Sequence, residues 1–414
     1  MKVFSGLSAQ VKQYLIITGN YWAFTLTDGA LRMLVVLYFH QLGYSPLSIA
    51  MLFLFYEIFG VITNLVGGWL GARIGLNKTM NIGLAMQILA LSMLLVPTSF
   101  LTIAYVMVAQ ALSGIAKDLN KMSAKSSIKL LVPASESGKL YQWVALLTGS
   151  KNTLKGIGFF LGGILLTWLG FTGAIALMAS MLTLVWFFSL FKLQADLGKA
   201  KHKPKFKDVL SKSRAINLLS AARLFLFAAR DVWFVVALPV YLASEFGWSH
   251  SWVGGFIAAW IVLYGFMQTL APKLTTKRAG MPPKSRDAAV WGAILVVVPA
   301  AMALALQGDF SAKWVVIAGL TVFALLFAIN SSLHSFLIVD IAGKDGVSLD
   351  VGFYYMANAC GRLLGTVLSG WIFQAYGLVA CLYVSAIFIA LAVLFAGLIQ
   401  PANGKASELS TSAK

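Results

Sequence analysis

Six basic side chains interrupt long apolar runs of the sequence, where a charge is costly. They are Arg32, Lys151, Lys155, Arg223, Arg230 and Arg362. Only three acids, Asp28, Glu57 and Asp231, stand in comparable runs. A charge near the centre of a bilayer costs about 2.5–3.5 kcal/mol, so such residues usually have a partner or bind something. The excess of cations over acids therefore predicts that the interior of this protein binds an anion.

The first candidates are Lys155 and Arg362, which begin two similar stretches. KGIGFFLGGILLTWLG at 155–170 aligns with RLLGTVLSGWIFQAYG at 362–377. The alignment also pairs three sets of glycines, Gly158 with Gly365, Gly163 with Gly370 and Gly170 with Gly377. Repeated halves are typical of transporters whose substrate site lies between the halves near mid-membrane. We therefore expect Lys155 and Arg362 to oppose each other across a pseudo-twofold axis.

Helical spacing places each of these two cations on a face that also carries small residues. Positions 151, 155, 158 and 162 share one face, and so do positions 358, 362, 365 and 369. The planar fork of arginine suits bidentate binding of phosphate or arsenate, whereas lysine supplies a point charge. We predict that Lys155 and Arg362 clamp an anion. The alternative is that each cation merely pairs with an acid such as Glu57.

Other polar residues in the apolar runs extend the predicted site. The further substrate-binding candidates are Arg230, Arg32, Lys151, Asn358, Tyr21 and Asn330. Asp28 and Arg32 are spaced i, i+4, which equally suits a structural ion pair within one helix. Acids inside membranes often relay protons, so Asp28, Glu57 and Asp231 are the candidates for proton coupling.

The composition indicates an integral membrane protein that is entirely α-helical. Of 414 residues, 59% are hydrophobic and 11% are charged, whereas a soluble domain carries roughly 25% charged residues. Twelve apolar segments of roughly 18–30 residues are long enough to span a bilayer as helices. We place them at 13–42, 47–72, 79–96, 100–124, 140–168, 172–192, 216–244, 251–272, 288–307, 313–339, 350–375 and 378–400. These runs are too long and too uniformly apolar for the strands of a membrane β-barrel.

The repeat divides the chain into two pseudo-symmetric six-helix bundles. We predict an N-terminal bundle at 1–192, a basic cytoplasmic linker at 193–215 and a C-terminal bundle at 216–414 that ends in a short cytoplasmic tail. The linker has no aromatic platform for nucleic acid, so we interpret it as a solvated segment near anionic lipid headgroups.

Basic residues orient the predicted helices in the membrane. Alternate loops at 43–46, 97–99, 169–171, 245–250, 308–312 and 376–377 contain no Lys or Arg. The positive-inside rule therefore places the other side, and both termini, in the cytoplasm. We assign Lys121 and Lys125 to that side, near the end of the fourth helix, with Lys117 and Asp118 as a neutral neighbouring pair.

No pattern typical of an enzyme, a cofactor site or a metal site appears in the sequence. GARIGLNKT at 71–79 lacks the spacing of a phosphate-binding loop, and the histidines at 40, 202, 250 and 334 do not cluster. Two cysteines, Cys360 and Cys381, are too few for a site that binds trivalent arsenic through three sulfurs. We expect no cofactor, and transport driven by a gradient of ion or substrate.

Two sets of residues resemble known families. GGWLGARIGLNK at 67–78 resembles the major facilitator loop GxxxD[RK]xG, although Ala72 stands where the acid is usual. The stretches GNYWAFTLTDGALRMLVVL, ALSGIAKDLNKMSAKSSIKLL, GKLYQWVALLTGSKNTLKGIGFFLGG and AARLFLFAARDVWFVVALPVYLAS are similar to the organoarsenical efflux permeases of the ArsJ family. This likeness covers nearly the whole chain. It implies export of 1-arseno-3-phosphoglycerate, which glyceraldehyde-3-phosphate dehydrogenase makes from arsenate, and hence arsenate resistance.

The residues and the resemblance agree on a carrier of a small, multiply charged anion. We expect a monomer in the bacterial inner membrane that works by alternating access and binds no nucleic acid. An organophosphate or other organic-anion carrier would use the same site with another ligand. A membrane receptor or scaffold is the alternative from another class, and the repeat and the mid-membrane charges argue against it.

Overall fold

The computed structural model describes residues 8–44, 52–133, 136–194, 197–201, 212–276 and 281–399. Within these ranges every regular element is a helix. A helix satisfies its backbone hydrogen bonds internally, as the interior of a bilayer requires, so long apolar runs favour it. The predicted all-α architecture is therefore confirmed.

The N-terminal half contains long helices joined by short turns. They are α1 (Ala9–Gln41), α3 (Leu54–Ile74), α4 (Leu76–Met93), α5 (Ile103–Leu131) and α6 (Ser137–Lys192), with a short 3-10 helix, η2 (Thr98–Phe100), before α5. Gly75 separates α3 from α4 with φ 103°, a conformation that glycine adopts readily. Thr102 caps α5, because its hydroxyl accepts a hydrogen bond from the backbone N–H of Tyr105.

The C-terminal half follows a similar plan with one additional break. Its helices are α7 (Arg214–Phe234), α8 (Ala237–Ser244), α9 (His250–Thr275), α10 (Ser285–Gln307), α11 (Ala312–Ile341) and α12 (Val347–Gly397). Serine hydroxyls cap two of them, Ser213 at the start of α7 and Ser249 at the start of α9. Helices α7 and α8 together match one predicted membrane segment.

Two glycines divide the longest helices at equivalent positions of the repeat. Gly170 in α6 has φ 66° and ψ −179°, and Gly377 in α12 has φ 73° and ψ −173°. Only glycine adopts this conformation without strain, and the alignment of the two halves pairs these two residues. Each long helix therefore contains two membrane segments, and the helices of the described residues match the twelve predicted segments and their pseudo-symmetry, with the start of the segment at 47–72 outside the described ranges.

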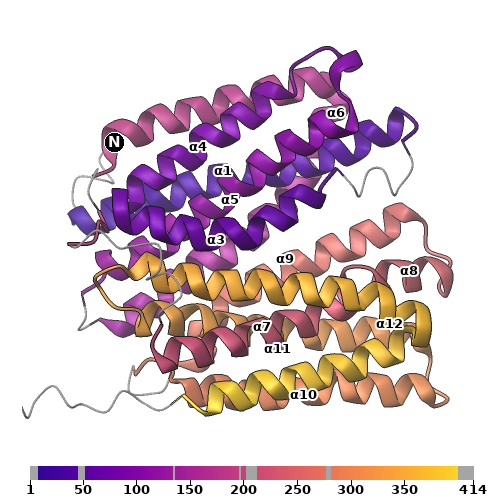
Figure 1. Ribbon diagram of the computed structural model, residues 1–414. Helices are drawn as coiled ribbons and strands as arrows, with labels where there is room; N and C mark the ends of the chain where they lie inside the picture. The colour runs from indigo at the N-terminus through magenta and orange to yellow at the C-terminus, as the bar shows by residue number, and fades with distance from the viewer. Residues whose placement is uncertain are drawn as a thin grey trace, which may run out of the picture.

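The two halves lie side by side, each with helices that run roughly in parallel. Figure 1 shows the N-terminal half in indigo to magenta above the C-terminal half, which ends in orange and yellow. One large cluster of buried hydrophobic residues fills the N-terminal half and reaches into α11 and α12, and a second fills the C-terminal half. The exact linker boundaries stay a prediction, since residues 202–211 lie outside the described ranges.

Several hydrogen bonds join the halves near the end of the molecule at which α1 begins (Figure 1). The Ser348 hydroxyl at the start of α12 donates to the Gly68 carbonyl near the end of α3, at 2.7 Å. The hydroxyls of Tyr141 on α6 and Thr275 on α9 are 2.7 Å apart. Lys129 on α5 donates to a carbonyl on α11 at 2.5 Å. The halves are therefore closed against each other at this end.

One predicted helix boundary was wrong, with consequences for the site. The fourth segment was expected to end at residue 124, but α5 continues to Leu131. The stretch after residue 124 is polar, and hydropathy alone ends the helix there. Packing against the C-terminal half continues it, so that Lys125 is 3% exposed.

Candidate anion-binding site

Three lysines form a stripe along one face of α5. Lys117, Lys121 and Lys125 follow one another at intervals of four residues, which places them on the same side of the helix. Lys117 lies at the midpoint of the helix, between Ile103 and Leu131. The sequence analysis assigned this group to the cytoplasmic side, which stays a prediction, and the structure adds that Lys125 is buried and Lys121 half-buried between helices.

Tyr56 on α3 connects the stripe with the acid on α1. The Lys117 ammonium lies 3.8 Å from the centroid of the Tyr56 ring, and the Arg32 guanidinium lies 4.5 Å from it. The Tyr56 hydroxyl donates hydrogen bonds to the carboxylate oxygens of Asp28, at 2.8 and 3.0 Å. Two cations thus share one aromatic ring, an arrangement that stabilises each of them without neutralising its charge.

Tyr355 on α12 meets the same stripe from the C-terminal half. Lys125 donates a hydrogen bond to the Tyr355 hydroxyl, and the Lys121 ammonium lies 5.0 Å from the centroid of the ring. Lys121 also pairs with Asp118 at 2.6 Å. Asp118 was counted with its neighbour Lys117 as a neutral pair, but its ion pair is with Lys121, because residues three apart on a helix face each other and adjacent ones do not.

Lys155 and Lys151 on α6 extend the basic cluster. Among the described residues, Lys155 forms no ion pair within 4 Å, and its ammonium lies 5.8 Å from the Phe159 ring centroid. Its charge interacts with those of Asp28 and Arg32 on α1. Lys151 donates to the Asn152 side chain at 3.2 Å, and its charge interacts with the α5 lysines.

The positive charges of Arg362 on α12 and Lys151 on α6 act on each other electrostatically across the two halves. The predicted clamp between Lys155 and Arg362 stays a prediction, because the described contacts of Lys155 lie within its own half. Arg362 lies on α12, in the half opposite to the lysines of α5 and α6.

A chain of polar side chains crosses from one half to the other. The Asn152 amide on α6 donates to Gln268 on α9 at 2.5 Å. Gln268 in turn donates to the hydroxyls of Tyr264 and Ser331, at 2.9 and 3.1 Å. Gln268 and Ser331 are completely buried, so each depends on these partners.

Arg223 continues this chain inside the C-terminal half. Its Nη1 donates to Ser331 on α11, and its Nε donates to the Asn358 side chain on α12 at 2.9 Å. The Phe227 ring centroid lies 4.0 Å from the guanidinium. Asn358 thus belongs to the same hydrogen-bond network, and its side-chain oxygen accepts the bond from Arg223.

Asp231 is fully buried between two other guanidinium groups. Its Oδ1 lies 2.6 Å from Nε and from Nη2 of Arg230, and its Oδ2 accepts from Nε of Arg362 at 3.3 Å. The acid that pairs with Arg362 is therefore Asp231, whereas the side chain of Glu57 lies outside the described residues. Arg362 keeps 37% of its side chain exposed, whereas the Asp231 side chain beside it is 1% exposed.

The small residues beside Lys155 and Arg362 serve packing within each half. A Cβ on Gly158 would lie 2.7 Å from the Leu26 carbonyl oxygen on α1. A Cβ on Gly365 would lie 2.7 Å from the Ala228 carbonyl oxygen on α7. Backbones in both places are therefore in contact, and these seams hold α6 on α1 and α12 on α7.

Two further predicted ligands occupy different settings. Tyr21 on α1 is 1% exposed, and its phenol interacts with Asp28, Asp118 and Tyr355, which places it inside the cluster. Asn330 donates instead to the Ala288 carbonyl on α10 at 2.9 Å. Asn330 therefore serves helix packing, and its geometry gives no support to a role in binding substrate.

Sequence reasoning missed the two tyrosines and the lysine stripe. The four-residue spacing of Lys117, Lys121 and Lys125 in the sequence would have predicted a basic face on this helix. Nothing in the sequence pattern distinguishes Tyr56 or Tyr355 from an interfacial aromatic residue, because their roles depend on contacts between helices far apart in the chain.

The fold and the cationic interior define an integral membrane transporter. The chain belongs to the Major Facilitator Superfamily, whose family model matches residues 17–337. It is a multi-pass membrane protein, as that superfamily's fold requires. No curated protein matches the chain significantly.

Solved structures of this superfamily share the fold at low sequence identity. The human organic anion transporter MFSD10 (TETRAN) is 16% identical, with a TM-score of 0.73 over 94% of this chain and 100% of that chain. The E. coli fucose:proton symporter FucP is 14% identical, with a TM-score of 0.72 over 94% and 100%. FucP in the outward conformation is 12% identical, with a TM-score of 0.76 over 95% and 100%.

Proposed function

We propose that this transporter exports a small organic anion with several negative charges by alternating access. The observation that carries the proposal is the charge of the interior cluster. Nine cations meet there, Arg32, Lys117, Lys121, Lys125, Lys151, Lys155, Arg223, Arg230 and Arg362, against the described carboxylates Asp28, Asp118 and Asp231. Such an excess is costly in a membrane unless an anionic ligand compensates it.

The two kinds of cation suit a ligand with an oxyanion at each end. The lysines of α5 and α6 supply point charges from the N-terminal half, and Arg362 supplies a planar fork from the other. The resemblance to ArsJ permeases narrows the ligand to 1-arseno-3-phosphoglycerate, which carries a phosphate and an arsenate. We infer that Lys155 and Arg362 bind opposite ends of this ester, and that export confers arsenate resistance.

The second candidate ligand is an organophosphate or another organic anion without arsenic. One protein of similar structure, MFSD10, is an organic anion transporter, and the same cations would serve such a ligand. Competition between the arsenic ester and 3-phosphoglycerate for transport separates these candidates, because a general carrier would accept both equally.

Several further features of the proposal rest on the sequence. We infer a monomer in the bacterial inner membrane, with both termini and the linker of residues 193–215 in the cytoplasm and the bundles at 1–192 and 216–414. The dehydrogenase supplies substrate and no cofactor is required. Asp28, Glu57 and Asp231 are the candidates to carry a coupled proton.

Transport into inside-out vesicles tests the proposal. Vesicles receive arsenate, glyceraldehyde 3-phosphate, NAD and glyceraldehyde-3-phosphate dehydrogenase on the outside. We expect arsenic to accumulate inside only when all components are present, and to depend on a proton gradient if a proton is exchanged. Accumulation of inorganic arsenate without the dehydrogenase, or none with it, would contradict the assignment.

Labelling of single cysteines tests the proposed orientation. Cysteines introduced at positions 98 and 310 should react with an impermeant reagent added to intact cells. A cysteine at position 203 should react only after the membrane is opened. Reaction at position 203 in intact cells would reverse the orientation.

A further inference from the structure

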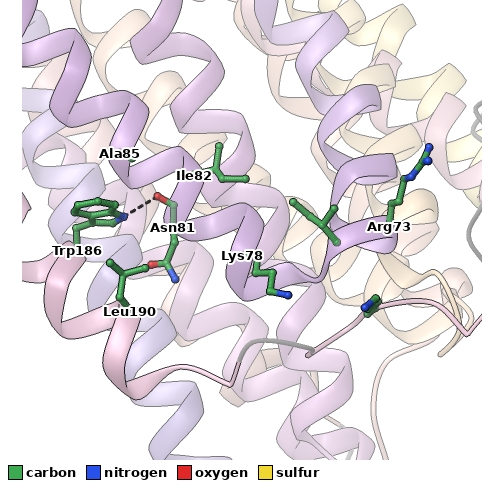
Figure 2. A pocket seen from close by; sticks show the side chains of 9 residues that line it. Arg73, Lys78, Asn81, Ile82, Ala85, Trp186 and Leu190 are labelled. Carbon is green, nitrogen blue, oxygen red and sulfur yellow. Dashed lines mark hydrogen bonds between the residues drawn. The ribbon is translucent and has the colours of Figure 1, made fainter.

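A pocket of about 660 Å³ lies between α4 and the second part of α6, away from the interior cluster. Its rim carries three cations, Arg73, Lys78 and Lys199. Apolar side chains, among them Ile82 and Leu190, line its other side, and none of the described lining residues is acidic. Figure 2 shows Lys78 and Arg73 at one end of the pocket, and Ile82, Ala85 and Leu190 along α4 and α6.

The cationic rim is held in place by the segment that follows α6. The backbone N–H of Leu76 donates to the Leu197 carbonyl at 2.7 Å, and the N–H of Ala200 donates to the Ala72 carbonyl at 2.8 Å. These two bonds fasten residues 197–200 across the turn between α3 and α4. They bring Lys199 to the basic end of α3 and the start of α4, although it is more than a hundred residues away in the chain.

Hydrogen bonds also join the two helices that line the pocket, α4 and α6. The Trp186 indole N–H donates to the Asn81 carbonyl at 3.0 Å (Figure 2). The Ser189 hydroxyl donates to the Asn81 side chain at 2.5 Å. Tryptophan at such a boundary is typical of the level of lipid headgroups. With the cationic end at the membrane surface, as the positive-inside rule expects, the apolar end lies inside the bilayer.

A second pocket of about 480 Å³ continues along the same pair of helices. It is lined mostly by apolar residues, including Ile88 of α4, Leu95 just beyond the end of α4 and Ala179 of α6. From Lys78 to Ile88 the rise along α4 is about 15 Å, which is half of a hydrocarbon core of about 30 Å. The two pockets together match the length of a headgroup followed by part of an acyl chain.

We propose that this groove binds an anionic phospholipid. The phosphate of the lipid lies at the Arg73, Lys78 and Lys199 rim, and one acyl chain lies along Ile82 and Ala85. A free phosphate or sugar phosphate would use the rim but would gain nothing from the apolar wall. The length and polarity of the groove therefore favour a lipid over a small anion.

Native mass spectrometry of the full chain in a neutral detergent tests this site. Dioleoyl-phosphatidylglycerol should bind at least about tenfold more tightly than dioleoyl-phosphatidylcholine. Each of Arg73→Gln, Lys78→Gln and Lys199→Gln should weaken phosphatidylglycerol binding about fivefold, the effect expected of one basic residue beside an anionic lipid. Lys192→Gln is the matched control, because Lys192 ends α6 but does not line the pocket.

Two further measurements separate the lipid from other occupants. Ala85→Trp fills the apolar wall and leaves the rim intact, so it should reduce phosphatidylglycerol binding while the unfolding temperature stays unchanged. Glycerol 3-phosphate should bind far more weakly than the lipid. Equal binding of the two lipids, an equal loss in Lys192→Gln, or glycerol 3-phosphate binding as tight as the lipid would each overturn the proposal.

Discussion

The two halves of the molecule differ in the groups that surround their buried acids Asp28 and Asp231. In the N-terminal half, Lys117 and Arg32 lie over the ring of Tyr56. In the C-terminal half, Arg230 and Arg362 are fastened to the carboxylate of Asp231. The ring of Tyr56 does not neutralise the charge of Lys117, whereas an ion pair compensates the charges of its partners, as it does for Lys121 beside Asp118 and for Arg230 beside Asp231.

For the proposed anion site, we expect from this difference that the two halves play different parts. The N-terminal half offers lysines, whose ammonium groups are point charges on flexible side chains. The C-terminal half offers a guanidinium fork that is already oriented by Asp231, and preorganised donors lose less entropy on binding. The pseudo-symmetry of the backbone therefore does not extend to the chemistry of the two bundles.

The largest effect should come from Asp231→Asn, because one change affects two guanidinium groups. Removing one partner from a buried ion pair typically costs about 3–5 kcal/mol of stability. The comparison variant is Asp28→Asn, whose partner Tyr56 is neutral, and it should cost less, about 1–3 kcal/mol. Thermal unfolding in detergent measures both. Equal losses would show that the two halves hold their acids alike.

Lys155→Gln should abolish most transport without loss of stability. Losing a desolvated contact between charges costs about 2–5 kcal/mol, which lowers transport by about thirtyfold or more. The unfolding temperature should not fall, since no described carboxylate within 4 Å loses an ion-pair partner. Lys139→Gln is the control, because this exposed lysine pairs with Glu136 at the surface. Transport that survives in Lys155→Gln would remove Lys155 from the site.

Exchanging arginine and lysine at positions 362 and 155 tests whether the two halves require different cations. Arg362→Lys should impair transport about tenfold or more, because a lysine cannot keep the Nε contact to Asp231 and also present a planar fork. The loss of one hydrogen bond to a charged group is about 1.5–3 kcal/mol. Lys155→Arg should retain more activity, because a point charge there needs no fixed geometry. The reverse order of the two rates would contradict the proposed division between the halves.

Gly158→Ala should destabilise the contact between α6 and α1. The added Cβ would meet the backbone of Leu26 and Gly29, and overpacking of this kind typically costs about 1–3 kcal/mol. Gly163→Ala is the matched control, because its Cβ would lie 3.8 Å from the side chain of Leu37, an ordinary contact. Unfolding temperatures of the two variants should differ. Similar values would mean that the seam tolerates a methyl group.

The smallest effect is expected from replacing both cysteines. Cys360 is half-buried on α12 and Cys381 is buried further along that helix, and neither belongs to the interior cluster. Cys360→Ser combined with Cys381→Ala should leave arsenate resistance of cells unchanged. Loss of resistance in a stably inserted double variant would reopen a mechanism based on thiolates.

The sequence by itself determined the number of membrane segments, the repeat and the two glycine breaks. Hydropathy measures a local transfer free energy, so it finds each span without knowledge of its neighbours. The alignment of Gly170 with Gly377 likewise compares local patterns. Both breaks appear where the repeat pairs them, each with a positive φ that favours glycine.

Only the tertiary structure decided which charges meet. Lys125 looked like a residue of a cytoplasmic loop, but packing between the halves extends α5 past it and brings Tyr355 to its ammonium. Arg362 donates a hydrogen bond to Asp231, 131 positions away in the chain. Pairing inside a membrane depends on which helix faces which, and helix packing is set by small residues and contacts far apart in the sequence. Composition reveals the excess of positive charge, but its distribution between the two halves follows from the way the helices pack.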